Sequence, residues 1–228
     1  MKKKSDMRFE FGENWEDYIK KNFNEDVLQI SKSRILDFLE VENIQNQSFL
    51  DIGCGSGLHS LAALEAGASS VHSFDFDVKS IEASVYLKNI TNKEKPWSIE
   101  QGSILDDKYI NKLPLFDIVY SWGVLHHTGD VWKGIKNAAS RVKPGGLFYI
   151  ALYSADVQID PGVEFWLDVK KKYISSGLIK RRWMELWYIW RFMMDRQLGK
   201  YTEVIERARE YKKERGMNLM TDVRDWLG

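Results

Sequence analysis

The chain of 228 residues contains few of the residues on which disulfide-rich or metal-binding proteins depend. Its single cysteine excludes a disulfide within the chain and favours a reducing compartment, so we expect a cytoplasmic protein. Four histidines and one cysteine, without the spacing of metal ligands, do not predict a metal site. Basic and acidic residues balance at 33 each, so the net charge does not indicate a dedicated nucleic-acid-binding protein.

Long apolar segments are also missing. No run of about 18 apolar residues occurs, so we expect no membrane span. The first residues, Met-Lys-Lys-Lys, are followed by Asp6, Arg8 and Glu10 rather than by the apolar segment of a signal peptide. The length is sufficient for one domain with an added segment.

The most informative stretch that is present runs from Phe49 to Gly57 and reads Phe-Leu-Asp-Ile-Gly-Cys-Gly-Ser-Gly. An apolar strand leads into three alternating glycines, and helical composition follows. Glycines let a ligand approach the backbone, and a helix start offers unpaired N–H groups with a partial positive charge. The pattern therefore predicts a turn that binds a nucleotide-like cofactor; the alternative is a purely structural strand-to-helix turn.

The glycine spacing and one carboxylate indicate which cofactor binds. Gly53, Gly55 and Gly57 are spaced G-x-G-x-G rather than G-x-G-x-x-G, and Asp51 would repel a pyrophosphate but attract an ammonium or sulfonium group. This run resembles motif I of the class I S-adenosylmethionine-dependent methyltransferases. The resemblance implies that Asp51 stabilises the methionine ammonium and that the turn, including Cys54, lies beside the cofactor.

Short apolar segments alternate with helical ones through the middle of the chain. This order predicts an α/β fold with a doubly wound, mostly parallel, Rossmann-like sheet. We expect strands over 49–52, 71–76, 97–101, 117–122 and 147–152, and helices over 58–66, 79–89 and 131–142. Pro144-Gly145-Gly146 is expected to end the last of these helices and to turn the chain into the fifth strand.

Three parts of the chain are expected around this pattern. Residues 1–48 form a helical extension, 49–155 the cofactor-binding core, and 156–228 a helical cap or insertion. In the extension, Phe11 and Trp15 either close the cofactor or substrate pocket or attach the extension to the core. The terminal β-hairpin common in the resembling family is missing, so either the chain is shortened or the cap replaces the hairpin.

Further candidate cofactor residues follow the second and third strands. Asp75 ends the second strand, where a carboxylate can accept both ribose hydroxyls, and Phe76 can lie against adenine. The alternative role for Asp75 or Asp77 is a helix N-cap, which we assign to Asp77. In the resembling family an aspartate after the third strand binds the adenine amino group. Ser103 occupies that position here, with the Ile104 backbone beside it, and the alternative is an ordinary loop serine.

The segment from Phe116 to Thr128 resembles motif IV of small-molecule methyltransferases, F-D-x-V-x-S-x-x-V-L-H-H. Ser121 and Trp122 would lie beside the cofactor, beyond the carboxyl end of a strand. His126 or His127 could remove a proton from the acceptor. Adjacent helical residues point in different directions, so we expect at most one of the two to be the base; alternatively one caps or packs against the sheet edge.

The aromatic and arginine-rich segment 183–196 has three interpretations. It could form an apolar cap above the acceptor pocket, a homodimer face, or a platform for nucleic acid. Salt-dependent RNA binding that is lost on replacing Arg181 or Arg191 would support the third interpretation.

Taken together, the motifs between 49 and 152 most resemble the ubiquinone-biosynthesis-like, small-molecule branch of the class I methyltransferases. The resemblance implies methyl transfer from S-adenosylmethionine to an O, N or C atom of a small-molecule acceptor, leaving S-adenosylhomocysteine. The alternatives are a transfer-RNA- or RNA-modifying methyltransferase, and a cofactor-binding but inactive regulatory or scaffold subunit. The Asp51 carboxylate and the glycine spacing argue against a dehydrogenase.

Overall fold

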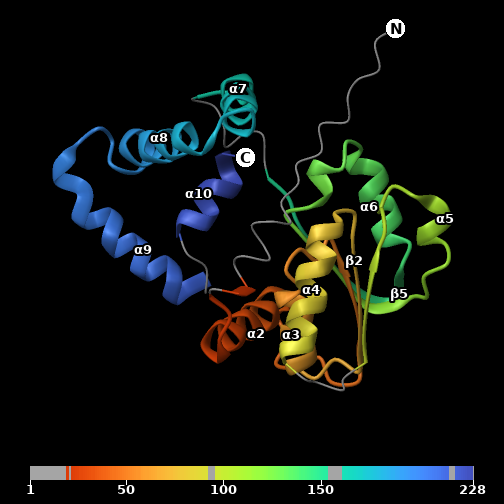
Figure 1. Ribbon diagram of the computed structural model, residues 1–228. Helices are drawn as coiled ribbons and strands as arrows, with labels where there is room; N and C mark the ends of the chain where they lie inside the picture. The colour runs from red at the N-terminus through yellow and green to blue at the C-terminus, as the bar shows by residue number, and fades with distance from the viewer. Residues whose placement is uncertain (1–18, 21, 92–95, 154–160, 216–218, 228) are drawn as a thin grey trace, which may run out of the picture. The chain divides into compact units, whose positions relative to one another are not determined.

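The computed structural model describes residues 19–20, 22–91, 96–153, 161–215 and 219–227 (Figure 1). Phe11 and Trp15, the candidate lid residues, lie outside the described residues. Contacts divide the chain into two compact units, one ending at Tyr153 and the other beginning at Ser154. No helix in the described ranges is both long and apolar enough to cross a membrane.

The first unit is built around a five-stranded sheet with the order β3-β2-β1-β4-β5, in which every paired strand is parallel. This architecture confirms the predicted α/β fold. Its elements are α2 (Glu25–Leu39), β1 (Ser48–Ile52), α3 (Leu58–Glu65), β2 (Ser70–Asp75), α4 (Val78–Ile90), β3 (Trp97–Gln101), α5 (Asp107–Ile110), β4 (Phe116–Trp122), the 3₁₀ turn η1 (Leu125–His127), α6 (Val131–Ala139) and β5 (Val142–Ala151).

Short polar side chains determine where several helices begin. Asn24 accepts a hydrogen bond from the Val27 amide at the start of α2, and Asp77 accepts one from the Lys79 amide at the start of α4. Asp130 does the same for α6 through the Lys133 amide. These side chains satisfy amide groups that a helix start leaves without a partner, and Asp77 is the cap that the sequence predicted.

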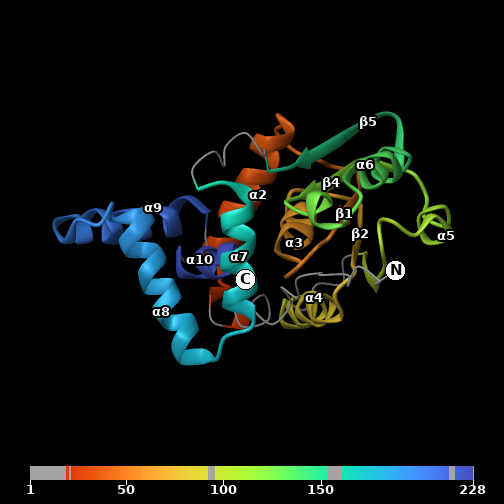
Figure 2. The same ribbon diagram turned by 90° about the horizontal axis from the view of Figure 1, so that it is seen from above.

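Helices cover both faces of the sheet. Figure 2 shows α2, α3 and α4 on one face and α5 and α6 on the other. An apolar core fills the space between the sheet and the helices α5 and α6. Its buried members are Leu50, Ile52, Phe74, Ile104, Ile110, Leu113, Phe116, Val119, Leu125 and Ala138.

The fifth strand differs from its prediction. β5 begins at Val142 rather than at Leu147, and the Pro-Gly-Gly segment lies within it as an irregularity in the register with β4. Gly145 has a left-handed φ of 77°. A Cβ on Gly146 would lie 2.6 Å from the carbonyl oxygen of Asp117, so close approach to β4 requires glycine there.

A polar cluster joins the amino ends of three strands in this unit. The Asp117 carboxylate accepts hydrogen bonds from the Ser48 amide at 2.8 Å and the Ser48 hydroxyl at 2.7 Å. The Lys143 ammonium lies 2.8 Å from the same oxygen. These hydrogen bonds hold the pKa of Asp117 well below its usual range. The cluster connects β1, β4 and β5 at the end of the sheet opposite the glycine turn.

The second unit is helical in its described residues. It contains α7 (Val163–Ile174), α8 (Leu178–Tyr188), the π-helix η3 (Ile189–Met193), η4 (Leu198–Lys200), α9 (Tyr201–Arg215) and α10 (Leu219–Leu227). Its own core is formed by Trp166, Val169, Tyr173, Val223 and Leu227. No strand follows β5 in the described part of the chain.

A buried carboxylate ties three helices of the second unit together. Glu185 on α8 accepts a hydrogen bond from the Tyr173 hydroxyl of α7 at 2.9 Å. It also accepts hydrogen bonds from Arg182 at 2.8 Å and from Arg224 of α10 at 3.3 Å. Burial raises the pKa of Glu185, but these hydrogen bonds outweigh burial and hold it below its usual value.

Candidate active site

The strand order indicates which end of the sheet holds the candidate site. After β3 the chain crosses to the opposite side of β1 and continues as β4, so the connections on the two sides of β1 diverge there. In open α/β sheets, ligands bind beyond the carboxyl ends of the strands at such a switch point. The loops that follow β1, β2 and β4 lie at this end, and they carry the predicted site residues.

The turn after β1 requires its glycines. Gly53, Gly55 and Gly57 all have left-handed φ angles, of 73°, 52° and 76°. A Cβ on Gly53 would lie 2.5 Å from the Val124 side chain after β4, and one on Gly57 would lie 2.8 Å from the Ser84 hydroxyl of α4. At Gly53 and Gly57 the backbone of the turn therefore lies too close to these neighbours to leave room for a side chain.

Asp51, at the carboxyl end of β1, lies at one end of a buried chain of hydrogen bonds. The Ser60 hydroxyl of α3 donates to its carboxylate at 2.5 Å. The hydroxyls of Ser60 and Ser73 lie 2.7 Å apart, and the Trp97 indole N–H donates to Ser73 at 2.8 Å. An indole can only donate, and the Ser60 proton is already directed at Asp51, so Ser73 must donate to Ser60.

Every member of this chain is almost fully buried. Asp51 is 3% exposed, Trp97 4%, and the two serines 0%. Three donors in series thus orient one carboxylate at the edge of the glycine turn. The sequence did not point to Ser60, Ser73 or Trp97, because a serine or tryptophan within an apolar segment carries no signal of its role.

Two neighbouring carboxylates give the site an acidic character. Burial raises the pKa of Asp51 to about 7; the Ser60 hydrogen bond opposes this shift, and the nearby Asp75 carboxylate adds to it. Burial also raises the pKa of Asp75, against the hydrogen bonds from the amides of Asp77 and Gly55. A cation bound here would stabilise both ionised carboxylates and so lower both pKa values, whereas a pyrophosphate would be repelled by them.

Asp75 is oriented by backbone amides at the end of β2. One carboxylate oxygen accepts from the Gly55 amide at 3.0 Å, and the other accepts from the Asp77 amide at 2.9 Å. Each carboxylate oxygen retains a second acceptor position, so both remain able to accept ribose hydroxyls. Phe76 follows with 52% of its surface exposed, as an adenine-contacting ring requires.

Four other predicted residues have side chains that are engaged elsewhere. Cys54 is buried with its sulfur 3.5 Å from the Ser84 hydroxyl, and its amide donates to the Phe74 carbonyl. The buried Ser121 hydroxyl donates to the Ile52 carbonyl at 3.1 Å. The Ser103 hydroxyl accepts from the Leu105 amide, and Ile104 is buried with its carbonyl bonded to Asn137. These side chains therefore hold the loops around the candidate site in place.

The two histidines after β4 lie together rather than apart. Their ring centroids are 4.1 Å apart, although adjacent helical residues were expected to diverge. Both belong to η1, a single three-residue turn, and both rings lie beside Tyr153, at 4.4 Å for His126 and 5.9 Å for His127. Tyr153 follows β5 at the same edge of the sheet and was not identified from the sequence.

A second group of aromatic rings surrounds Trp122. Trp122 at the end of β4 is 40% exposed and stacks on Phe38 of α2 with centroids 4.5 Å apart. His59, on the first turn of α3, lies edge-on to Trp122, and its Nδ1 is 3.0 Å from the Tyr120 hydroxyl. Burial lowers the pKa of His59 to about 4, so this imidazole is neutral near pH 7. His59 was not identified from the sequence.

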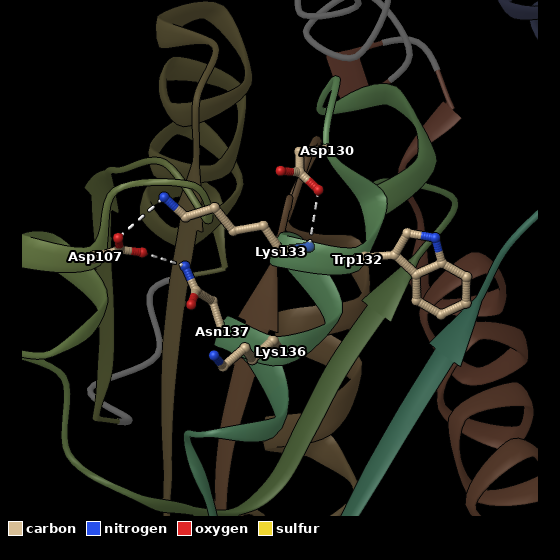
Figure 3. Close-up of a pocket in the computed structure, with 6 residues that line it drawn as sticks. All are labelled: Asp107, Asp130, Trp132, Lys133, Lys136 and Asn137. Carbon is tan, nitrogen blue, oxygen red and sulfur yellow. Dashed lines mark hydrogen bonds and ion pairs between the residues drawn. The ribbon is translucent and has the colours of Figure 1, made fainter.

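A separate hollow of about 550 Å³ lies beside α5 and α6. Figure 3 shows Lys133 and Asn137 reaching toward Asp107, while Trp132 points to the other side of the helix. The Lys133 ammonium and the Asn137 amide each lie 3.0 Å from the Asp107 carboxylate. These polar groups satisfy one another, so they connect α5 and α6 and have a structural role.

Comparisons with known proteins agree on one family. A family model described as a methyltransferase domain matches residues 23–208. A ubiquinone biosynthesis O-methyltransferase of Parvibaculum lavamentivorans is 33% identical over 116 residues, covering 51% of this chain and 44% of that protein. A tRNA U34 carboxymethyltransferase of Idiomarina loihiensis is 28% identical over 109 residues, covering 46% of this chain and 32% of that protein.

The solved structures share the fold. A putative S-adenosyl-L-methionine-dependent methyltransferase of Methanococcus maripaludis has a TM-score of 0.51 at 18% identity, covering 95% of this chain and 83% of that one. The first two curated relatives match over 44% and 53% of their own length, so the chain spans about half of each.

Proposed function

Because the chain belongs to the class I S-adenosylmethionine-dependent methyltransferase family, we propose that it transfers a methyl group to a small-molecule O, N or C nucleophile. The observation that carries the proposal is the buried Asp51 carboxylate at the end of β1, oriented by Ser60 and adjacent to the glycine turn and Asp75. This arrangement suits a cationic nucleoside and opposes a pyrophosphate.

The described residues fit S-adenosylmethionine group by group. Asp51 would neutralise the methionine ammonium, and its raised pKa indicates a carboxylate that gains from a nearby cation. Asp75 would accept the ribose hydroxyls while its amide contacts hold it in place. Phe76 would contact the adenine face. A Cβ at Gly53 or Gly57 would collide with neighbouring side chains, which explains why glycine occupies these two positions.

The cofactor supplies a methyl group that its sulfonium has already activated. The protein then has to align the acceptor and exclude water, and Trp122 with its aromatic neighbours provides an apolar wall for this. His126 or His127 would take the proton from the acceptor, with Tyr153 positioning both rings. Replacing both histidines with alanine should reduce turnover far more than cofactor affinity; an equal reduction in both would refute a role in proton transfer.

One observation favours a small molecule over RNA as the acceptor. Arg181, a candidate phosphate contact, instead donates to the carbonyls of Tyr173, Ile174 and Ser176 at the end of α7. Its guanidinium therefore acts as a helix cap.

The test is calorimetry followed by transfer of label. The full chain should bind S-adenosylhomocysteine and not NAD, and Asp75→Ala should weaken binding by about 1–3 kcal/mol, the cost of losing hydrogen bonds to a charged group. Asp37→Asn on α2 removes an exposed carboxylate that is not a candidate cofactor residue and should leave binding unchanged. Labelled methyl transfer to a panel of hydroxyl, amine and carbon acids then tests activity. Binding of the cofactor with transfer to RNA alone, or to no acceptor, would refute the small-molecule proposal.

A further inference from the structure

The second unit contains a pocket whose lining combines aromatic rings with arginines. Its volume is about 610 Å³, within the range of small-ligand sites. The lining residues are Pro161, Phe165, Trp187, Trp190, Arg191, Phe192 and Arg196. We propose that this pocket binds a planar aromatic anion, such as an aromatic carboxylate, as a site that is independent of the glycine turn.

The backbone around the pocket has an unusual local geometry. α8 continues directly into the π-helix η3, in which the Met194 amide bonds to the Ile189 carbonyl at 2.9 Å. π-helical turns are rare and are frequent at functional sites. Trp190, Arg191 and Phe192 all belong to this turn, so the irregular segment supplies three of the lining side chains.

The residues after η3 hold the second arginine beside the first. Asp195 and Arg196 have left-handed φ angles of 47° and 63°, which is uncommon for residues other than glycine. The Arg196 amide donates to the Trp190 carbonyl at 2.9 Å, which fixes this bend against the π-helix. Such strained conformations persist where the surrounding structure supports them, and they gather at ligand sites.

Two arginines give the lining of the pocket a positive charge. Neither Arg191 nor Arg196 forms a side-chain hydrogen bond or an ion pair with any residue that the structure describes. The Asp195 carboxylate, which also interacts electrostatically with Arg191, is paired with Lys200 at 2.8 Å. By contrast, Arg182 and Arg224 are both bonded to Glu185. The guanidinium donors of the two pocket arginines are therefore available to an anionic ligand.

The rings determine the shape of that anion. The Arg191 guanidinium lies 5.0 Å from the centroid of Phe192, so its planar fork is oriented by an aromatic face. A guanidinium binds a carboxylate through two parallel hydrogen bonds, and exposed tryptophans stack on flat apolar groups. Trp190 is 42% exposed and Phe165 40%, so both rings have surface to offer. A flat ring with one carboxylate matches both features.

The experiment compares two compounds of the same shape on the full chain. Calorimetry with 2-naphthoate and its neutral amide, 2-naphthamide, isolates the contribution of the charge. We expect the acid to bind about tenfold or more tightly than the amide, and added salt to reduce the difference. Saturating S-adenosylhomocysteine should not displace the acid. Equal affinity for acid and amide, no binding of the acid, or displacement by the cofactor product would overturn the proposal.

Variants assign the effect to the pocket. Arg191→Gln and Arg196→Gln should each weaken binding of the acid about tenfold and leave the amide unchanged. Arg207→Gln on α9 makes the same change of charge on an exposed residue outside the pocket and should have no effect. Trp190→Ala should weaken both compounds, whereas Trp183→Ala, which removes a 69% exposed ring that does not line the pocket, should not. A single-stranded oligonucleotide that competes with the acid and binds more tightly would replace this proposal with a nucleic-acid platform.

Discussion

Replacing Ser60 with alanine should weaken cofactor binding in a manner that depends on pH. The Ser60 hydroxyl is fully buried and donates to the Asp51 carboxylate at 2.5 Å. A hydrogen bond to a charged group contributes about 1.5–3 kcal/mol, which equals one to two powers of ten in the ionisation constant of the carboxyl group. Its loss raises the pKa of Asp51, which is already about 7, above the pH of an ordinary assay.

The expected affinity change follows from the fraction of ionised Asp51. Near pH 7.5 most of the wild-type carboxylate is charged, whereas most of the Ser60→Ala carboxyl is protonated, so affinity for S-adenosylhomocysteine should fall about tenfold. Above about pH 10 both proteins carry the charge and their affinities should converge. Ionisation of the ligand's own amine affects both proteins equally, so the affinity ratio isolates Asp51.

Calorimetric titration of both proteins across this pH range measures that ratio. Ser31→Ala is the matched control, because Ser31 is also buried on a helix and its hydroxyl bonds only to the Val27 carbonyl within α2. A ratio that stays constant with pH, or a Ser60→Ala protein that binds as well as wild type near pH 7, would refute the role assigned to Ser60.

Three further predictions concern stability. Asp51→Asn should abolish cofactor binding yet stabilise the fold above pH 7 by roughly 4 kcal/mol. The folded state raises the pKa of Asp51 from 3.8 to about 7, so the ionised carboxylate destabilises the wild-type fold increasingly as the pH rises from about 4 to 7. Urea unfolding should therefore show the gain in stability at pH 8 and not at pH 4. Asp117→Asn should lower the melting temperature at pH 7. The difference in melting temperature from wild type should become smaller as the pH falls below about 4, because a carboxylate whose pKa is lowered by folding stabilises the fold only while it is ionised. Glu185→Ala should destabilise the second unit by about 1–3 kcal/mol through its lost partners Tyr173 and Arg224, and unchanged protection of α7 and α10 in hydrogen exchange would contradict this.

The fold followed from local sequence because each strand is a short apolar run bounded by glycine or polar residues. β3 has the predicted bounds, and the other strands except β5 start or end within one residue of their predictions. β5 was mispredicted because Pro144 and two glycines signal a turn. Whether they form a turn or a bulge depends on the backbone of β4, which passes within contact distance of Gly146.

The candidate site was accessible from sequence only where residues stand at strand ends. Asp51 and Asp75 end neighbouring parallel strands, so the topology brings them to one edge. The hydrogen bonds from Trp97 through Ser73 to Ser60 could not be predicted, because they depend on how three elements, β3, β2 and α3, pack together. Tyr153 likewise joins the two histidines only because β4 and β5 are neighbours in the sheet.

The most direct test of the central claim is a crystal structure of the full chain with S-adenosylhomocysteine. We expect the ligand's ammonium within about 3 Å of the Asp51 carboxylate and its ribose hydroxyls on Asp75. The backbone of the glycine turn should lie against the ligand. A ligand bound elsewhere, or one at the turn whose ammonium contacts neither carboxylate, would contradict it.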